Sequence, residues 1–431
     1  MRNVCTALLW AVGLLVLSTS GVVAQTAAAP ASRPAGSPAE WADRARQICA
    51  EQKYPSTYSR MKLTEALARA GKAADAWAVV KASGHYPGAY LEYIVRGQTQ
   101  AGDFAGARRS IADAADESVK DIGRELLATA LARHGDLKDA QAVAGEIKID
   151  RYKAGAQVGI IAAQADTDVK GALAAAEALA AKDVQTLALA AVARAQAAAG
   201  DFDAARATAA KLSTESVSIF GMGLASRSFV LIDVKKIQAA APMHKVRQDL
   251  IGADTDAIPA IAPSGEYRGR DRVFKILDTA LAAAGDPAAA RKAMSEAQVV
   301  IPTLKDYPNH YQSHGWTYMA LTLAALHDAA GAKAAAARAF EVGLKDEIGG
   351  FASQCAPNLG ALLVIQGDVE TALQHVQAFK DADTAAPMAQ AIGYAMVRHG
   401  QAAQLLQLLP KVTDPTRGMF LCLGASMTPG K

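Results

Sequence analysis

Apolar and polar positions repeat along this chain in units of about 32 residues. Each unit has an apolar, alanine-rich stretch of helical length, an anchor residue that is usually glycine, and a second apolar stretch. The clearest copies read "AGDFAGARRSIADA" from Ala101 and "AGDFDAARATAAKL" from Ala199. The anchors are Gly71, Gly102, Gly135, Thr167, Gly200, Ile232, Gly285, His327, Gly367 and Gly400. A repeat of roughly 20–50 residues is typical of arrays of stacked units.

The residues around each anchor predict a helical hairpin. Glycine suits the left-handed residue that ends a helix, and aspartate directly after it suits the N-cap of the next helix. Aspartate follows the anchor at Asp103, Asp136, Asp168, Asp201, Asp233, Asp286, Asp328 and Asp368. Alanine stands five residues after the anchor at Ala76, Ala107, Ala140, Ala172, Ala205, Ala290, Ala332 and Ala372. A small side chain there allows close approach of the two helices. One hairpin cannot bury its own apolar faces, so it must stack on neighbours.

This pattern resembles the tetratricopeptide repeat over about Tyr54 to Pro410. The Trp and Tyr that the family carries in its first helix are mostly missing, and its Pro at the end of the unit is matched only at Pro302 and roughly at Pro87. The resemblance implies an all-α fold, an α-solenoid superhelix of about ten stacked helix-turn-helix repeats of 31–42 residues. Helical-hairpin solenoids of related classes with a similar period are the alternative.

The N-terminal residues predict export. Arg2 precedes the apolar stretch "ALLWAVGLLVL", and the small residues before Ala24/Gln25 form a cleavage site, so we expect a signal peptide at 1–24 and a periplasmic or secreted protein. An uncleaved membrane anchor is the alternative. The Ala/Pro/Ser/Gly composition of 25–38 is typical of a disordered linker. No later stretch has the length of a membrane span.

The interval between Ile232 and Gly285 divides the array. It is about 20 residues longer than the earlier intervals. We therefore expect N-terminal repeats with a capping helix at 39–241, an insertion at 242–270, and C-terminal repeats with a capping helix at 271–431. Long irregular segments inside compact arrays are often functional. A tolerated surface insertion is the alternative, because loop length adds little to the cost of closure.

Composition narrows the function classes. The formal charge of +3 and the absence of a clustered basic region argue against nucleic acid as a partner. Cys49, Cys355 and Cys422 remain after the signal peptide. We expect no disulfide, because Cys355 and Cys422 lie two units apart and a disulfide needs Cα atoms within about 7 Å. The sequence contains no nucleophile motif and no glycine-rich phosphate loop.

The stretch "YPNHYQSHGWTY" is one candidate binding region. Aromatic residues are frequent in binding surfaces. The stretch contains Tyr307, His310, Tyr311, His314, Trp316 and Tyr318. It favours either a glycan or other non-protein ligand site, or packing of these aromatics against the next unit. His310 and His314 have the i,i+4 spacing of a zinc motif, but the residue after His310 is Tyr311 rather than the required Glu. A metal-dependent enzyme is therefore an unfavoured alternative, and we expect no bound metal and no cofactor.

The inner groove of a solenoid is the second candidate region. Counting back from the anchors, groove-facing positions hold Arg69, Arg96, Arg133, Arg194 and Arg398, and positions further back hold Glu65, Glu92, Glu125, Arg272 and Lys275. Arginine near a helix C-terminus also complements the helix dipole, which is the structural alternative. The sequence predicts a non-enzymatic scaffold or adapter that binds a protein or peptide in this groove. We assign Arg96, Arg194, Tyr307, Tyr311, His314 and Trp316 as candidate binding residues.

Overall fold

The computed structural model describes residues 36–52, 55–83, 88–218, 224–251, 268–283, 285–304, 308–346 and 350–428. Gly36–Lys431 is one compact unit, and Met1–Ala35 is a second unit that lies outside the described residues together with the predicted signal peptide. The predicted all-α fold is confirmed. Besides its helices, the described part of the chain has one short antiparallel pair, β1 (Val217–Ser218) with β2 (Leu224–Ala225).

Nine pairs of consecutive described helices form hairpins around the predicted anchors, as the repeat pattern indicated. The pairs are α2 (Thr57–Arg69) with α3 (Ala73–Ser83), α4 (Gly88–Gln100) with α5 (Phe104–Ala112), α6 (Glu117–Arg133) with α7 (Leu137–Gly145), α8 (Asp150–Ala165) with α9 (Val169–Glu177), α10 (Lys182–Ala198) with α11 (Phe202–Ala210), α13 (Arg268–Ala282) with α14 (Pro287–Val300), α15 (Pro308–Ala325) with α16 (Ala329–Gly343), α17 (Ala356–Ile365) with α18 (Val369–Ala378), and α19 (Ala382–Arg398) with α20 (Ala402–Leu408). The short helices are η1 (Ile301–Thr303), η2 (Phe351–Cys355) and η3 (Leu409–Lys411). Single helices are α1 (Pro38–Glu51), α12 (Arg227–Ile251) and α21 (Pro415–Ser426).

Seven of the nine hairpin turns have the left-handed residue that the anchors predicted, whereas Thr167 and Gly285 have no positive φ. Positive φ angles between 75° and 93° occur at Gly71, Gly102, Gly135, Gly200, Gly367 and Gly400. His327 also has a positive φ, of 61°, although it carries a side chain. The aspartate after the anchor accepts a backbone N–H bond as the N-cap at Asp103, Asp136, Asp168, Asp201, Asp286, Asp328 and Asp368. The eight predicted alanines are all buried, so eight of the nine hairpins have a methyl group at this contact, and the hairpin of α19 and α20 has the buried Leu405 there.

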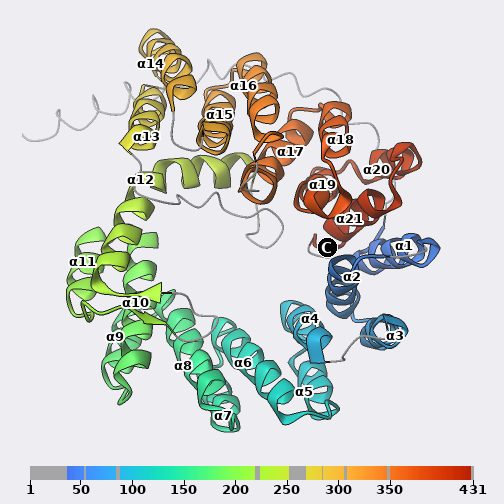
Figure 1. Ribbon diagram of the computed structural model, residues 1–431, viewed down its shortest axis with the longest axis vertical. Helices are drawn as coiled ribbons and strands as arrows, with labels where there is room; N and C mark the ends of the chain where they lie inside the picture. Colours follow the sequence, from blue (N-terminus) through green and yellow to red (C-terminus); the bar gives the residue numbers. More distant parts are fainter. Residues whose placement is uncertain are drawn as a thin grey trace, which may run out of the picture. The chain divides into compact units, whose positions relative to one another are not determined.

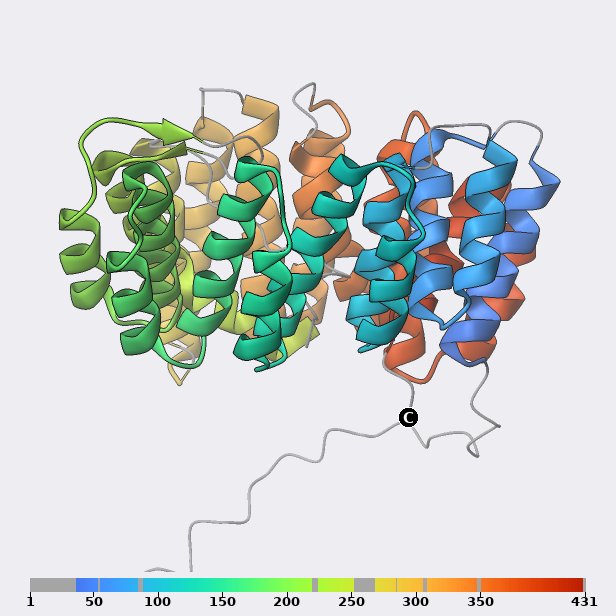
Figure 2. The ribbon, with the colours of Figure 1, turned by 90° about the horizontal axis from the view of Figure 1, so that it is seen from below.

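The stack of hairpins closes on itself. The first helices α2, α4, α6, α8 and α10 pack in sequence, α12 continues to α13 and α15, and α17 and α19 lead to α21. Helix α21 then packs against α1 and α2, so the unit Gly36–Lys431 forms a closed ring (Figure 1). Seen from the side, the helices stand roughly upright along this ring (Figure 2). The sequence predicted the stacking but not the contact between the two ends.

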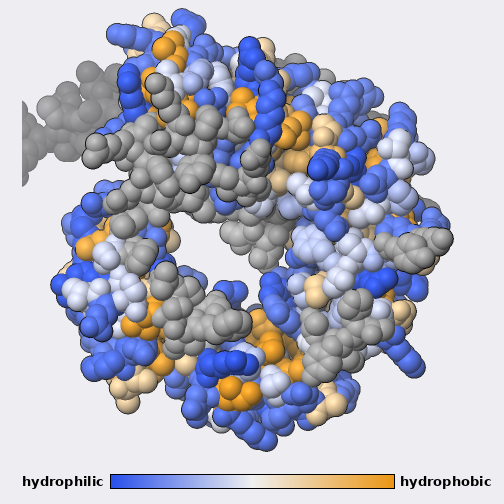
Figure 3. All heavy atoms as spheres, viewed as in Figure 1, coloured by the Kyte–Doolittle hydropathy of each residue, from blue (hydrophilic) through white to orange (hydrophobic). Residues whose placement is uncertain are grey.

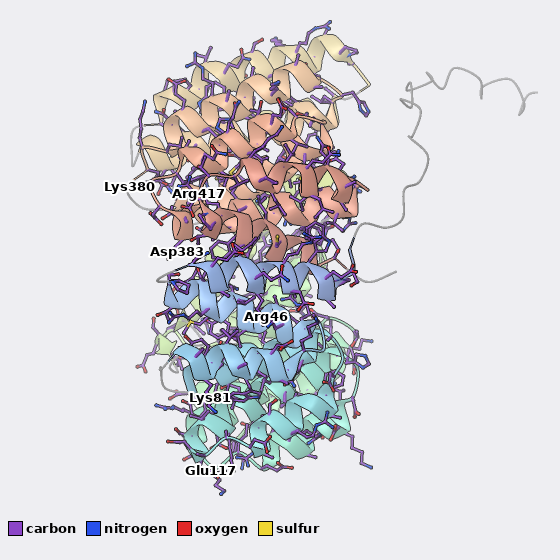
Figure 4. All side chains as sticks on the ribbon, turned by 90° about the vertical axis from the view of Figure 1, so that its right-hand side faces the viewer. Arg46, Lys81, Glu117, Lys380, Asp383 and Arg417 are labelled. Atoms are coloured by element: carbon purple, nitrogen blue, oxygen red, sulfur yellow. The ribbon has the colours of Figure 1, made fainter. Side chains whose placement is uncertain are left out.

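Side chains from both ends of the chain meet at this closing contact, which we call the seam. The hydroxyl of Ser56 donates to Oδ1 of Asp383 at 3.0 Å. The rings of Tyr58 and Phe420 lie 5.8 Å apart. Figure 4 faces the seam, with Asp383 directly above the first helices of the chain. Within the described residues, the ends of the array are therefore covered by each other.

Helix α12 departs from the repeat. The anchor assigned to Ile232 and the cap assigned to Asp233 are wrong, because both residues lie inside this single 25-residue helix. The helix continues through Ile251 and so covers residues 242–251 of the predicted insertion, whereas residues 252–267 lie outside the described residues. Buried Arg247 donates from Nε to Oδ1 of Asn358 at 2.7 Å, which attaches the end of α12 to α17.

The three cysteines of the described residues, Cys49, Cys355 and Cys422, are buried and form no disulfide. Burial raises the pKa of the Cys422 thiol to about 12, which keeps it protonated. No helix in the described ranges has both the length and the apolar character needed to cross a membrane.

Two glycine substitutions test the anchor geometry. Gly200→Ala places a Cβ on a residue with a φ of 87°, and we expect this to lower the free energy of unfolding by about 1–2 kcal/mol. Gly418→Ala lies inside α21, where a Cβ meets no atom within 4 Å. We expect the higher helix propensity of alanine to raise the free energy of unfolding by about 0.5–1 kcal/mol. Thermal unfolding of both variants checks this. Equal effects of the two substitutions would contradict the assigned role of the anchor.

Candidate functional site

A pocket of about 880 Å³ lies where the C-terminal ends of α2, α4 and α6 meet the end of α21. Its lining residues include Arg69, Arg96, Gln100, Phe104, Glu125, Leu126, Thr129, Ala130, Arg133, His134, Met427 and Thr428. The first helices of the hairpins border the hollow inside this unit (Figure 3). The pocket is therefore the part of the predicted groove in which charged residues from three successive repeats come together.

The repeat explains why these arginines meet. Arg69 and Arg133 both stand two residues before their anchors, and Arg96 stands six residues before Gly102. All three therefore lie in the last two turns of equivalent helices. Because neighbouring first helices pack side by side in register, the guanidinium groups reach the same pocket. Their position also complements the helix dipoles.

Two of the arginines have partners within the protein. Arg69 donates to Oε1 of Glu65 at 3.0 Å and to Oε1 of Gln100 at 2.8 Å, and Lys62 also binds Glu65. Arg96 forms an ion pair with Glu92, and both of these side chains keep 40% of their surface exposed. These contacts hold two guanidinium groups in place on the wall of the pocket.

Arg133 and Glu125 differ from these pairs. Arg133 is exposed, and no side chain of the described residues hydrogen-bonds or forms an ion pair with it. Glu125 is half-buried and likewise has no hydrogen-bonding or ion-pair partner in the described part of the chain. Burial, and to a smaller extent the nearby Glu92, raises the pKa of the Glu125 carboxyl to about 7. A group of the pocket therefore changes charge near neutral pH.

Helix α8 gives Glu125 its position. A Cβ at Gly155 would overlap Oε1 of Glu125, and a Cβ at Gly159 would overlap Oγ1 of Thr129. The two glycines are four residues apart, as are the two polar residues on α6. The glycines therefore lie on the face of α8 that receives these side chains. Both Glu125 and Thr129 also line the pocket.

A smaller pocket of about 120 Å³ adjoins the first across the seam. It shares Arg69, Arg96, Gln100 and Met427 with the larger pocket and adds residues from both ends of the chain. The added residues are Lys62, Glu65, Ala66, Gln390 and Leu423. Sequence reasoning missed the contributions of α19 and α21, because it did not bring the two ends of the chain together.

The predicted site residues are not all in one place. Arg96 lines both pockets. Arg194 instead forms an ion pair with Asp233 of α12 at 2.8 Å, which joins α10 to α12. Arg398 donates to the hydroxyl of Tyr394 at 2.7 Å. The arginines predicted from one slot of the repeat therefore have different surroundings in the ring.

The aromatic stretch is largely a packed element. Tyr311 and His314 on α15 are buried, with 6% and 1% of their surface exposed, and Tyr318 is buried as well. Trp316 is half-buried, and Tyr307 lies outside the described residues. Burial of these side chains agrees with the structural alternative, in which they pack against neighbouring helices.

The two histidines of this stretch lie together. The rings of His310 and His314 are 4.4 Å apart, and Nδ1 of His310 is 3.1 Å from Oδ2 of Asp346. Asp346 also accepts the backbone N–H of Phe351 at 3.2 Å. Among the residues that the structure describes, no group of three or more His, Cys, Asp or Glu side chains is arranged to hold a metal ion.

Comparison with known proteins does not assign the chain to a family, because no family model matches it and no curated protein has significant similarity to it.

The pKa of Glu125 predicts a pH-dependent variant. In the folded protein the Glu125 carboxyl keeps its proton up to about pH 7, whereas an unfolded glutamate loses its proton near pH 4.3. The folded state therefore binds more protons between these two pH values, and the free energy of unfolding falls as the pH rises through this range. Because the group keeps some exposure, we expect Glu125→Gln to stabilise the protein at pH 8 by only about 1 kcal/mol. At pH 4, where the carboxyl is protonated in the folded protein, we expect Glu125→Gln to leave the free energy of unfolding unchanged.

Thermal unfolding at both pH values measures this difference. Glu370→Gln, at an exposed position on the outer helix α18, is the matched control. An equal effect of Glu125→Gln at both pH values would contradict the raised pKa.

Proposed function

We propose that this protein is a non-enzymatic scaffold or adapter of the cell envelope, and that it binds a protein partner through an extended peptide segment in the pocket at α2, α4, α6 and α21. The observation that carries the proposal is the 880 Å³ pocket, whose charged lining comes from three successive repeats. Pockets of about 300–1,000 Å³ suit ligands of a few residues.

The class of the repeat supports this proposal. The hairpins carry the glycine turn, the aspartate cap and the buried alanine that led to the resemblance to tetratricopeptide repeats. Arrays of this kind present extended concave surfaces to their partners. We propose the periplasm or the cell exterior as its location, because residues 1–24 have the pattern of a signal peptide.

The two alternatives have weaker support. A glycan site at Tyr307–Tyr318 would have to use the half-buried Trp316, because Tyr311 and Tyr318 are buried. A metal-dependent enzyme would have to recruit ligands beyond His310 and His314, since Asp346 already contacts His310 and the Phe351 amide.

Selection from a random peptide library tests the proposal. The wild-type protein is compared with Arg96→Gln/Arg133→Gln, which alters the pocket and leaves the Arg69–Glu65 pair intact. We expect the wild type to enrich peptides and this variant to bind them at least tenfold more weakly, because both charges lie in the pocket.

The matched control is Arg206→Gln/Arg291→Gln, which removes two exposed arginines from the outer helices α11 and α14. It should bind the enriched peptides like the wild type. Failure to enrich any peptide, or equal loss in both double variants, would overturn the proposed function.

A further inference from the structure

Glu125, when ionised, and Arg133 are opposite charges on one helix, and both line the same pocket. They are eight residues apart on α6, which corresponds to about 12 Å along the helix axis and a rotation of about 80°. Neither has a hydrogen-bonding or ion-pair partner among the described residues. The pocket therefore has one negative and one positive position that the protein itself leaves unsatisfied.

The other charges at the pocket are already paired within the protein. Arg69 and Arg96 line it from α2 and α4, where Glu65 and Glu92 form ion pairs with them. Glu92 also lies close enough to Glu125 to raise its pKa. Helix α8 brings the backbone of Gly155 against Glu125, and a glycine adds no charge there.

Between the two charges, the surface of α6 is apolar or only weakly polar, and the paired Arg96 of α4 lines the pocket beside it. Leu126, Thr129 and Ala130 of α6 line this part, and Met427 lies at the end of α21. A ligand that spans the two charges would therefore place uncharged residues in the middle of the pocket.

We propose that the pocket recognises an extended peptide segment in which a basic and an acidic side chain are four residues apart, with small apolar residues between them. The basic side chain binds Glu125 and the acidic side chain binds Arg133. An extended chain rises about 3.3 Å per residue and its side chains alternate between two faces, so residues four apart share a face and span about 13 Å. This matches the separation of the two charges along α6. The inference rests on the proposed function and specifies its ligand.

Short synthetic peptides with both ends blocked test the charge pattern, because their charges then come only from side chains. The set has Lys and Glu four residues apart, Lys at both positions, Glu at both positions, or Lys and Glu adjacent, each on an alanine–valine background. Binding is measured by isothermal titration calorimetry with the full protein at about pH 8.5, where the Glu125 carboxyl, with its pKa of about 7, is ionised. We expect the wild type to prefer the four-residue Lys–Glu peptide by about tenfold over the other three.

Single charge reversals then move the preference in opposite directions. Glu125→Lys should prefer the peptide with two Glu residues, and Arg133→Glu the peptide with two Lys residues. Because the Glu125 carboxyl packs closely on Gly155, Glu125→Gln is a second, less disruptive variant. It should lose the preference for the Lys–Glu peptide over the peptide with Glu at both positions. Arg291→Glu on α14 is the control and should keep the wild-type preference.

The outcomes separate the two proposals. If library peptides bind but the defined peptides do not, or if the reversals leave the preference unchanged, the charge pattern is wrong while the proposed function stands. If neither library nor defined peptides bind, the proposed function fails.

Discussion

The packing of α1 and α2 against α21 is the contact on which the rest of the structure depends. Each hairpin buries its apolar faces only against its neighbours, so an open stack would leave one such face uncovered at each end. Here these two faces cover each other, with the Ser56–Asp383 hydrogen bond and the Tyr58–Phe420 contact across the seam. The same constraint fixes which first helices face each other in the ring and brings the end of α21 to the pocket.

Closure also explains the location of the candidate site. In an open solenoid the inner wall of the first repeats would belong to the N-terminal half of the chain alone. In the ring, α2, α4 and α6 share their pocket with Met427 and Thr428 from the other end of the sequence. The adjoining smaller pocket combines Lys62 and Glu65 with Gln390 and Leu423. The integrity of this site is therefore coupled to the seam.

The local structure was largely predictable from the sequence, because its determinants are local. Glycine turns, aspartate caps and buried alanines each act within one hairpin, and even His327 was placed correctly at a left-handed turn. The pattern failed at Ile232, which is not a residue that favours a turn and lies inside one long helix. Arg96 and Glu125 were found by counting from the anchors, and the repeat brings them together.

Closure was not predictable from these local patterns, because it depends on contacts between residues more than three hundred positions apart. One sequence feature did point to burial of the C-terminal end, namely the stretch "RGMFLCLGAS" of α21. In the structure, every residue from Arg417 to Ser426 is buried. A terminal cap needs a polar outer face, and a helix that is apolar on all sides indicates burial instead. The surroundings of Arg194 were missed for a related reason, since its partner Asp233 was assigned to a cap.

The measurement that tests the closed ring most directly is the distance between the two sides of the seam in solution. Spin labels at the exposed positions Glu51→Cys at the end of α1 and Thr413→Cys just before α21 leave the seam contacts in place and can be measured by double electron–electron resonance, with the unsubstituted protein as control for the buried native thiols. We expect one narrow distance population below about 25 Å, since packed helices lie about 8–10 Å apart. A broad population beyond about 50 Å, as expected for an open stack of nine hairpins at this spacing, would contradict the closed ring.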